Sequence, residues 1–195
     1  MTSPPHLAPI KHQLLSIVRE HGYRYSPEPF QLASGEMSHD FIDAKAALAN
    51  GADLLLACEF MLACVADAGV DFDAAGGLTM GADQFAHGLA VISGKDWFVV
   101  RKERKGRGTN ELVEGTRITK GTRVLLVDDI VTTGGSMMKA HQAIIDTGAQ
   151  IVAAATLVDR GEVATADMDR LGIPYFPLIT YRDLDIAPVG RSLVT

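Results

Sequence analysis

VLLVDDIVTTGGS, residues 124–136, is the stretch that decides the fold. Its apolar start predicts a buried strand over Arg123–Val127, and the acids Asp128 and Asp129 follow directly. A short loop of threonine, glycine and serine then leads into a predicted helix over residues 136–147. A buried strand, a polar loop and a helix in this order form the repeating unit of a parallel α/β sheet.

The same alternation extends on both sides of this stretch. The fold class expected is α/β, with a mainly parallel sheet of five or six strands flanked by helices. Asn50 is placed to cap a predicted helix over residues 52–68, and Gly69 is placed to end it. Residues 102–116 are polar and predict a loop. Further strands are predicted at 74–76, 97–101, 151–158 and 175–179, and helices at 10–21, 52–68, 82–92 and 163–171.

The N-terminal part, residues 1–45, predicts a helix followed by a small hood. Tyr23–Pro29 contains two prolines and predicts an irregular connection. Two short strands, Phe30–Leu32 and Phe41–Asp43, are expected around the turn Ser34–Gly35. With 195 residues and no linker, the chain is expected to form a single domain over residues 1–195.

Composition excludes several classes of protein. The net charge of −6 argues against a nucleic-acid partner, because such proteins present a basic surface to phosphates. No apolar run is long enough to cross a bilayer, and the N-terminus lacks the pattern of a signal peptide, so a cytoplasmic protein without a membrane partner is expected. Cys58 and Cys64 fall in the second predicted helix and are expected to be core residues in a reducing compartment.

The chemistry of residues 124–136 suits a phosphorylated sugar. Backbone N–H groups of a glycine-containing loop at a helix N-terminus bind phosphate, and three hydroxyls add donors. Carboxylates beside a phosphate need another partner, either a sugar diol or Mg²⁺. The spacing excludes a P-loop and a dinucleotide fingerprint. The loop residues are Thr132, Thr133, Gly134, Gly135 and Ser136.

A second charged segment lies at residues 101–107, where five of seven residues are cations. It can be a solvated basic turn, a nucleic-acid patch without the usual aromatic residues, or a clamp for a charged leaving group. The third interpretation suits the phosphorylated sugar, because a closing loop also excludes water from the reaction.

Residues 124–136 resemble the binding signature for phosphoribosyl pyrophosphate (PRPP) of the type I phosphoribosyltransferases. The resemblance implies that Asp128 and Asp129 hold the ribose hydroxyls and that Thr132–Ser136 hold the 5′-phosphate, with Ile130 and Val131 in the same PRPP-binding stretch. Residues 98–108 resemble the catalytic loop of orotate phosphoribosyltransferases. This second resemblance implies a homodimer that shares the loop between subunits, and contacts to PRPP and pyrophosphate from Arg101, Lys102, Lys105 and Arg107. Arg107 stands where the family usually has histidine and cannot donate a proton near neutral pH.

Three shorter resemblances complete the expected site. Residues 76–83 are similar to the family's pyrophosphate loop, which implies PRPP contacts from Thr79 and Met80, although many relatives carry lysine at the position of Met80. Residues 32–35 are similar to the turn that covers the base, with Ala33 at a position usually held by lysine. By the same resemblance, three side chains are expected to contact orotate: Ser34, Thr132 and Arg160, with Arg160 pairing to the carboxylate.

The activity implied is transfer of the phosphoribosyl group of PRPP to orotate, giving orotidine 5′-monophosphate and pyrophosphate in pyrimidine (UMP) biosynthesis. Mg²⁺ is the expected cofactor, held mainly by the pyrophosphate and not by direct side-chain ligation. Two alternatives remain open: an enzyme for another base or aromatic carboxylate, and a non-catalytic regulator that senses PRPP. The basic loop favours an enzyme, and a regulator would usually carry a DNA-binding domain or a basic face.

Overall fold

A computed structural model describes residues 5–32, 34–103 and 112–190. The helical elements in these ranges are η1 Pro5–Leu7, α1 Ala8–Ile17, the π-helical turn η2 Val18–Gly22, α2 Ala44–Ala47, α3 Gly51–Asp67, α4 Asp83–Ser93, α5 Gly135–Ile145, α6 Val163–Leu171 and α7 Tyr181–Leu184. The strands are β1 Tyr23–Gln31, β2 Met37–Ile42, β3 Ala74–Leu78, β4 Asp96–Val100, β5 Val113–Gly115, β6 Arg123–Val131, β7 Gln150–Asp159 and β8 Tyr175–Thr180.

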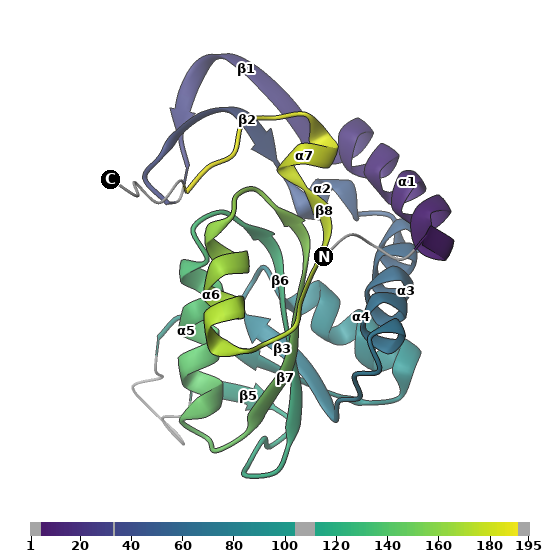
Figure 1. The fold of residues 1–195 in the computed structure, drawn as a ribbon, viewed down its shortest axis with the longest axis vertical. Coiled ribbons are helices and arrows are strands. Elements are labelled where there is room, and N and C mark those ends of the chain that lie inside the picture. Colours follow the sequence, from purple (N-terminus) through teal and green to yellow (C-terminus); the bar gives the residue numbers. More distant parts are fainter. Residues whose placement is uncertain (1–4, 33, 104–111, 191–195) are drawn as a thin grey trace.

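A six-stranded sheet in the order β5-β4-β3-β6-β7-β8 forms the centre of the molecule. All neighbouring strands are parallel except β4 and β5. Helices α1, α3 and α4 cover one face and α5 and α6 the other, while β1 and β2 lie beyond one end of the sheet (Figure 1). The predicted α/β class with a mainly parallel sheet of five or six strands flanked by helices is confirmed.

The hood, residues 23–42, differs from the prediction. Strand β1 runs from Tyr23 to Gln31 and includes the segment predicted to be irregular. Its pairing with β2 shifts register between Tyr25 and Phe30, so Pro27 and Pro29 fall where the ladder is interrupted. A bulge needs fewer N–H donors than a regular ladder, which is why proline is accepted there.

The predicted loop over residues 102–116 is also partly wrong. Its last part forms β5, a three-residue strand that pairs antiparallel with β4. A strand this short leaves no alternation that sequence reading can detect. The part of the predicted loop at 104–111 lies outside the described residues.

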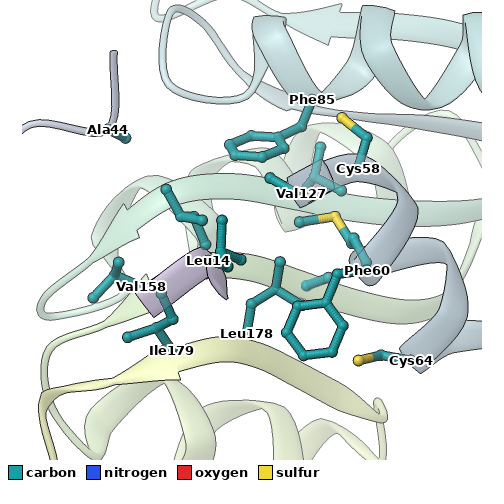
Figure 2. Close-up of a cluster of buried hydrophobic side chains, with 14 of the residues drawn as sticks. Leu14, Ala44, Cys58, Phe60, Cys64, Phe85, Val127, Val158, Leu178 and Ile179 are labelled. Atoms are coloured by element: carbon teal, nitrogen blue, oxygen red, sulfur yellow. The ribbon is translucent and has the colours of Figure 1, made fainter. Parts of the chain in front are cut away.

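Two buried clusters hold the helices to the sheet. One lies between α1, α3, α4 and the sheet and contains Leu14, Phe60, Phe85, Val127 and Leu178 (Figure 2). The other lies under α5 and α6. Both thiols belong to the first cluster and are free, and burial raises the pKa of Cys58 to about 12 and of Cys64 to about 11. They are therefore core residues, as predicted.

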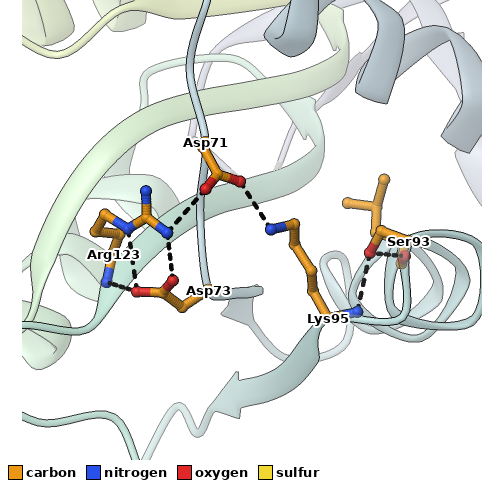
Figure 3. A network of polar contacts seen from close by, with 6 residues as sticks. Asp71, Asp73, Ser93, Lys95 and Arg123 are labelled. Atoms are coloured by element: carbon orange, nitrogen blue, oxygen red, sulfur yellow. Dashed lines mark hydrogen bonds and ion pairs between the residues drawn. The ribbon is translucent and has the colours of Figure 1, made fainter.

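The amino ends of the parallel strands carry a separate polar network (Figure 3). Arg123, the first residue of β6, donates to Asp73 at 2.6 Å and pairs with Asp71 at 2.9 Å, and Lys95 joins Asp71 at 2.7 Å. Hydrogen bonds from Arg123 lower the pKa of Asp73 to about 2. This network ties the beginnings of β3, β4 and β6 together, at the sheet edge opposite to the acid pair. No helix in the described ranges has both the length and the apolarity needed to span a bilayer.

Candidate active site

The acid pair lies inside strand β6, not after it as predicted. The ladder continues because β7 extends alongside, with Ile130 opposite Val158 and Val131 opposite Asp159. Thr156 on β7 donates its hydroxyl to the backbone carbonyl of Asp129 at 3.0 Å. The two carboxylates are therefore held on a rigid strand at the carboxyl edge of the sheet, where open α/β sheets bind ligands.

Hydrogen bonds fix both carboxylates. The backbone N–H of Asp129 donates to Asp128 Oδ1 at 3.0 Å, and that of Ile130 donates to Asp129 Oδ1 at 2.7 Å. The other oxygen of Asp129 lies 3.4 Å from Lys45 Nζ. Backbone N–H groups thus hold one oxygen of each acid, and Lys45 pairs with the second oxygen of Asp129.

Asp128 is 4% exposed and has an unusual titration behaviour. Burial, and then the charge of Asp129, raise its pKa to about 7. A carboxyl group in this condition accepts a proton near neutral pH unless a hydrogen-bond donor or cation replaces the lost water. The pair is therefore suited to a ligand that brings hydroxyl donors or a cation to it.

The loop after β6 leads into helix α5 through Gly134, whose φ of 75° requires the left-handed conformation. No side chain caps the N-terminus of α5. Its first N–H groups are therefore available to an anion, and the helix dipole favours negative charge at this position. The loop and helix start therefore have the features that favour phosphate binding, and the phosphate site stays a prediction.

A cavity of about 220 Å³ lies in front of this loop. It is smaller than the roughly 300–1,000 Å³ of drug-sized ligand pockets and matches a small polar ligand. Ser34 closes it from the hood, and its hydroxyl has no hydrogen-bond partner. The cavity is lined by Ser34, Asp128, Ile130, Val131, Thr132, Thr133, Gly134, Gly135, Ser136 and Lys139.

The turn after β3 packs against the acid pair. The hydroxyl of Thr79 donates to Asp83 at 2.8 Å, the peptide bond between Thr79 and Met80 is cis, and the Met80 side chain is 67% exposed. A Cβ atom on Gly81 would lie 2.5 Å from Asp129 Oδ1 and 2.8 Å from Asp128 Oδ1. Glycine is therefore needed here for the turn to approach the carboxylates.

We expect Gly81→Ala to lower kcat/KM for the predicted sugar-phosphate substrate by about 100-fold, because the added methyl group displaces carboxylates that must be placed to within an ångström. Steady-state kinetics measures the loss. Gly51→Ala is the matched control, since a Cβ atom there meets nothing within 4 Å. Wild-type kinetics in Gly81→Ala would show that the acid pair does not need its present position.

Arg160 is buried under the hood, at 1% exposure, not on the surface. Its guanidinium donates to the backbone carbonyl of Asp40 at 2.9 Å and to the hydroxyl of Ser38 at 3.1 Å, both on β2. Its Nε atom has no hydrogen-bond partner. The side chain thus connects the end of β7 to the hood and keeps one donor unpaired.

The basic segment begins at the same sheet edge as the acid pair. Thr79 N–H donates to the carbonyl of Val100, so Arg101 follows β4 directly beside the turn after β3. Arg101 pairs with Glu114 of β5 at 3.0 Å, and Lys102 is exposed. Neither side chain lines the cavity. Three further predicted positions, Ala33, Lys105 and Arg107, lie outside the described residues.

Sequence reading missed two lysines at this site. Lys139 lines the cavity from the second turn of α5, and the spacing of that helix could have indicated it. Lys45 reaches Asp129 across 84 residues of sequence, and no local pattern marks such a contact. Within residues 5–32, 34–103 and 112–190, no cluster of three or more His, Cys, Asp or Glu side chains is placed to hold a metal ion.

The fold and site define a class of protein: an α/β domain with an acid pair at the carboxyl edge of its sheet and, next to it, a glycine-containing loop that enters an uncapped helix. Residues 49–169 match the model of the phosphoribosyl transferase domain. An orotate phosphoribosyltransferase of Pyrococcus abyssi is 35% identical over 155 residues, covering 80% of this chain and 85% of the relative. One of Streptomyces avermitilis is 41% identical over 150 residues, covering 74% and 81%.

A solved structure agrees with these sequence relatives. Orotate phosphoribosyltransferase of Mycobacterium tuberculosis in complex with PRPP is 32% identical and has a TM-score of 0.75, covering 91% of this chain and 100% of that one. The chain belongs to the orotate phosphoribosyltransferase family, whose members are pentosyltransferases.

Proposed function

We propose that this protein transfers the phosphoribosyl group of PRPP to orotate, forming orotidine 5′-monophosphate and pyrophosphate in pyrimidine biosynthesis. The observation that carries the proposal is a cavity lined both by Asp128 of the acid pair and by the loop that leads into the uncapped N-terminus of α5. This arrangement offers acceptors for ribose hydroxyls and donors for a 5′-phosphate. The family of the chain supports the same substrate.

Within this proposal, the two halves of the cavity have separate roles. Asp128 and Asp129 accept the ribose hydroxyls, while Ile130, Val131 and the loop Thr132–Ser136 hold the phosphate end through N–H groups and hydroxyls. Catalysis by such a site consists of positioning and electrostatic stabilisation, since the residues that line it include no strong nucleophile.

The leaving pyrophosphate is assigned to the turn after β3 and to the basic segment. Thr79 and Met80 directly precede Gly81, which lies against the acid pair, and Arg101 and Lys102 begin the segment at the same edge. Lys105 and Arg107 are proposed to complete it from the neighbouring subunit of a homodimer. Charge from such side chains stabilises the pyrophosphate as it departs.

Mg²⁺ fits this site as an ion carried by PRPP. The acid pair offers at most two carboxylates, and one oxygen of Asp129 is already paired to Lys45. An Mg²⁺ ion carried by PRPP would neutralise charge on the pyrophosphate. Asp128 and Asp129 would contact the ribose of this PRPP molecule and would hold the ion only indirectly, through the substrate.

Orotate is assigned to the space between the hood and the loop. Ser34 and Thr132 line the cavity there, and the unpaired Nε of Arg160 supports a role in recognising the orotate carboxylate. An arginine that discriminates a carboxylate selects an acidic base over a neutral one. We further propose a cytoplasmic location, which suits two free thiols in the core.

The experiment that tests this function is a panel of bases mixed with the protein, PRPP and Mg²⁺, with pyrophosphate release as the readout. We expect release with orotate and none with uracil or adenine. Release with another base alone would replace the substrate, and tight PRPP binding without release from any base would point to a regulator.

A further inference from the structure

Lys45 is the residue of the site whose role the fold alone does not explain. It lies on α2, the short helix that follows the hood, and its Nζ atom is 3.4 Å from Asp129 Oδ2. Its side chain is 55% exposed, whereas that of Asp129 is 15% exposed. In the described part of the chain, it is the one lysine or arginine with an ion pair to either acid of the pair.

The backbone around Lys45 is firmly held. Asp43 caps α2 by accepting hydrogen bonds from the N–H groups of Lys45 and Ala46, and its own N–H donates to Gly22. Ala44 and Ala47 are buried in the core cluster under the hood. Lys45 is the only charged residue of this helix. The capped and partly buried helix α2 therefore holds the ammonium group of Lys45 close to the acid pair.

The position of this ammonium matters because of the shape of PRPP. The pyrophosphate is attached to C1 of the ribose, next to the hydroxyl on C2. A cation beside the carboxylate that accepts a ribose hydroxyl therefore also lies close to the first phosphate of the leaving group. The turn after β3 offers no cation of its own at this place, since Met80 is uncharged and Gly81 has no side chain.

We propose that Lys45 binds the pyrophosphate of PRPP from within the same subunit, and that its ion pair with Asp129 is exchanged for this contact when PRPP enters. The exchange leaves Asp129 free to accept a ribose hydroxyl. A half-exposed ion pair is weak and costs little to break, whereas a phosphate carries more charge than a carboxylate. This inference rests on the proposed function.

Calorimetric titration of the full chain tests the proposal with three ligands: PRPP with Mg²⁺, inorganic pyrophosphate and ribose 5-phosphate. We expect Lys45→Met to weaken PRPP and pyrophosphate at least tenfold and to change ribose 5-phosphate less than twofold. Lys45→Arg should recover most of the affinity, because it keeps the charge. Lys120→Met is the control, since it removes the same charge at the opposite sheet edge, just before β6.

Each other outcome overturns the proposal. An equal loss for ribose 5-phosphate and PRPP would show that Lys45 only positions Asp129. Unchanged PRPP and pyrophosphate affinity in Lys45→Met would remove the contact, while orotate turnover by the wild type would keep the proposed function intact. A wild type that binds none of the three ligands would end both proposals.

Discussion

Asp128→Asn is expected to lower kcat/KM for PRPP by about 100-fold and at the same time to stabilise the fold above pH 7. The loss follows because a hydrogen bond from a hydroxyl to a charged acceptor contributes about 1.5–3 kcal/mol, and an amide oxygen is a weaker acceptor. The gain follows because Asp128 is almost fully buried beside a second carboxylate.

The sign of the stability effect comes from the raised pKa. Burial and the charge of Asp129 raise the pKa of Asp128 to about 7 in the native state. Between the ordinary aspartate pKa and about 7, the native state holds a proton that the unfolded chain has released. Stability of the wild type therefore falls as pH rises through this range, and asparagine removes the loss.

Thermal unfolding at pH 5 and pH 8, together with PRPP kinetics, checks both effects. The Tm of Asp128→Asn should exceed that of the wild type by several degrees at pH 8, and the gap should shrink at pH 5. Asp169→Asn is the matched control, because Asp169 is exposed on α6. A gap that does not change with pH, or wild-type PRPP kinetics in Asp128→Asn, would contradict this account of the acid pair.

Arg160→Ala is expected to raise the KM for orotate at least tenfold and to destabilise the fold by about 2–4 kcal/mol. The substitution removes a fully buried side chain and leaves the Asp40 carbonyl and the Ser38 hydroxyl without their guanidinium donors. The hood then loses a direct connection to β7. Affinity for PRPP should change little, because the guanidinium of Arg160 contacts strand β2 of the hood and not the loop Thr132–Ser136.

Denaturant unfolding and separate titrations with PRPP and orotate resolve these two effects. Arg160→Lys retains the charge but not the planar fork, so it should recover part of the stability and little of the orotate affinity. Arg24→Ala, at an exposed position on β1, controls for loss of a hood arginine. A folded Arg160 variant with the wild-type KM for orotate would remove Arg160 from the base site.

The parts of the fold that were predicted correctly are those set by local pattern. Helix α6 begins and ends at Val163 and Leu171 as its apolar spacing indicates, and Asn50 caps α3 by accepting from the N–H of Ala52. The carboxyl edge of the central strand could be read because four apolar residues and two acids stand in one run. These patterns depend only on residues close together in the sequence, so they can be recognised without the tertiary structure.

The missed features all depend on partners far away in the chain. Strand β1 tolerates two prolines only because β2 pairs with it around a bulge. The burial of Arg160 depends on β2, 120 residues earlier. The segment before the C-terminus contacts both the hood and the site, with Gly190 donating to Glu36 at 2.6 Å and Val189 donating to the Arg160 carbonyl at 2.8 Å. No periodic pattern of apolar residues predicts such long-range contacts.

The measurement that tests the central claim most directly is product identification after the wild-type protein is incubated with PRPP, orotate and Mg²⁺. The account predicts orotidine 5′-monophosphate and pyrophosphate in equal amounts, with neither formed when PRPP is omitted. Orotate left unconsumed by a folded protein that binds PRPP would contradict it.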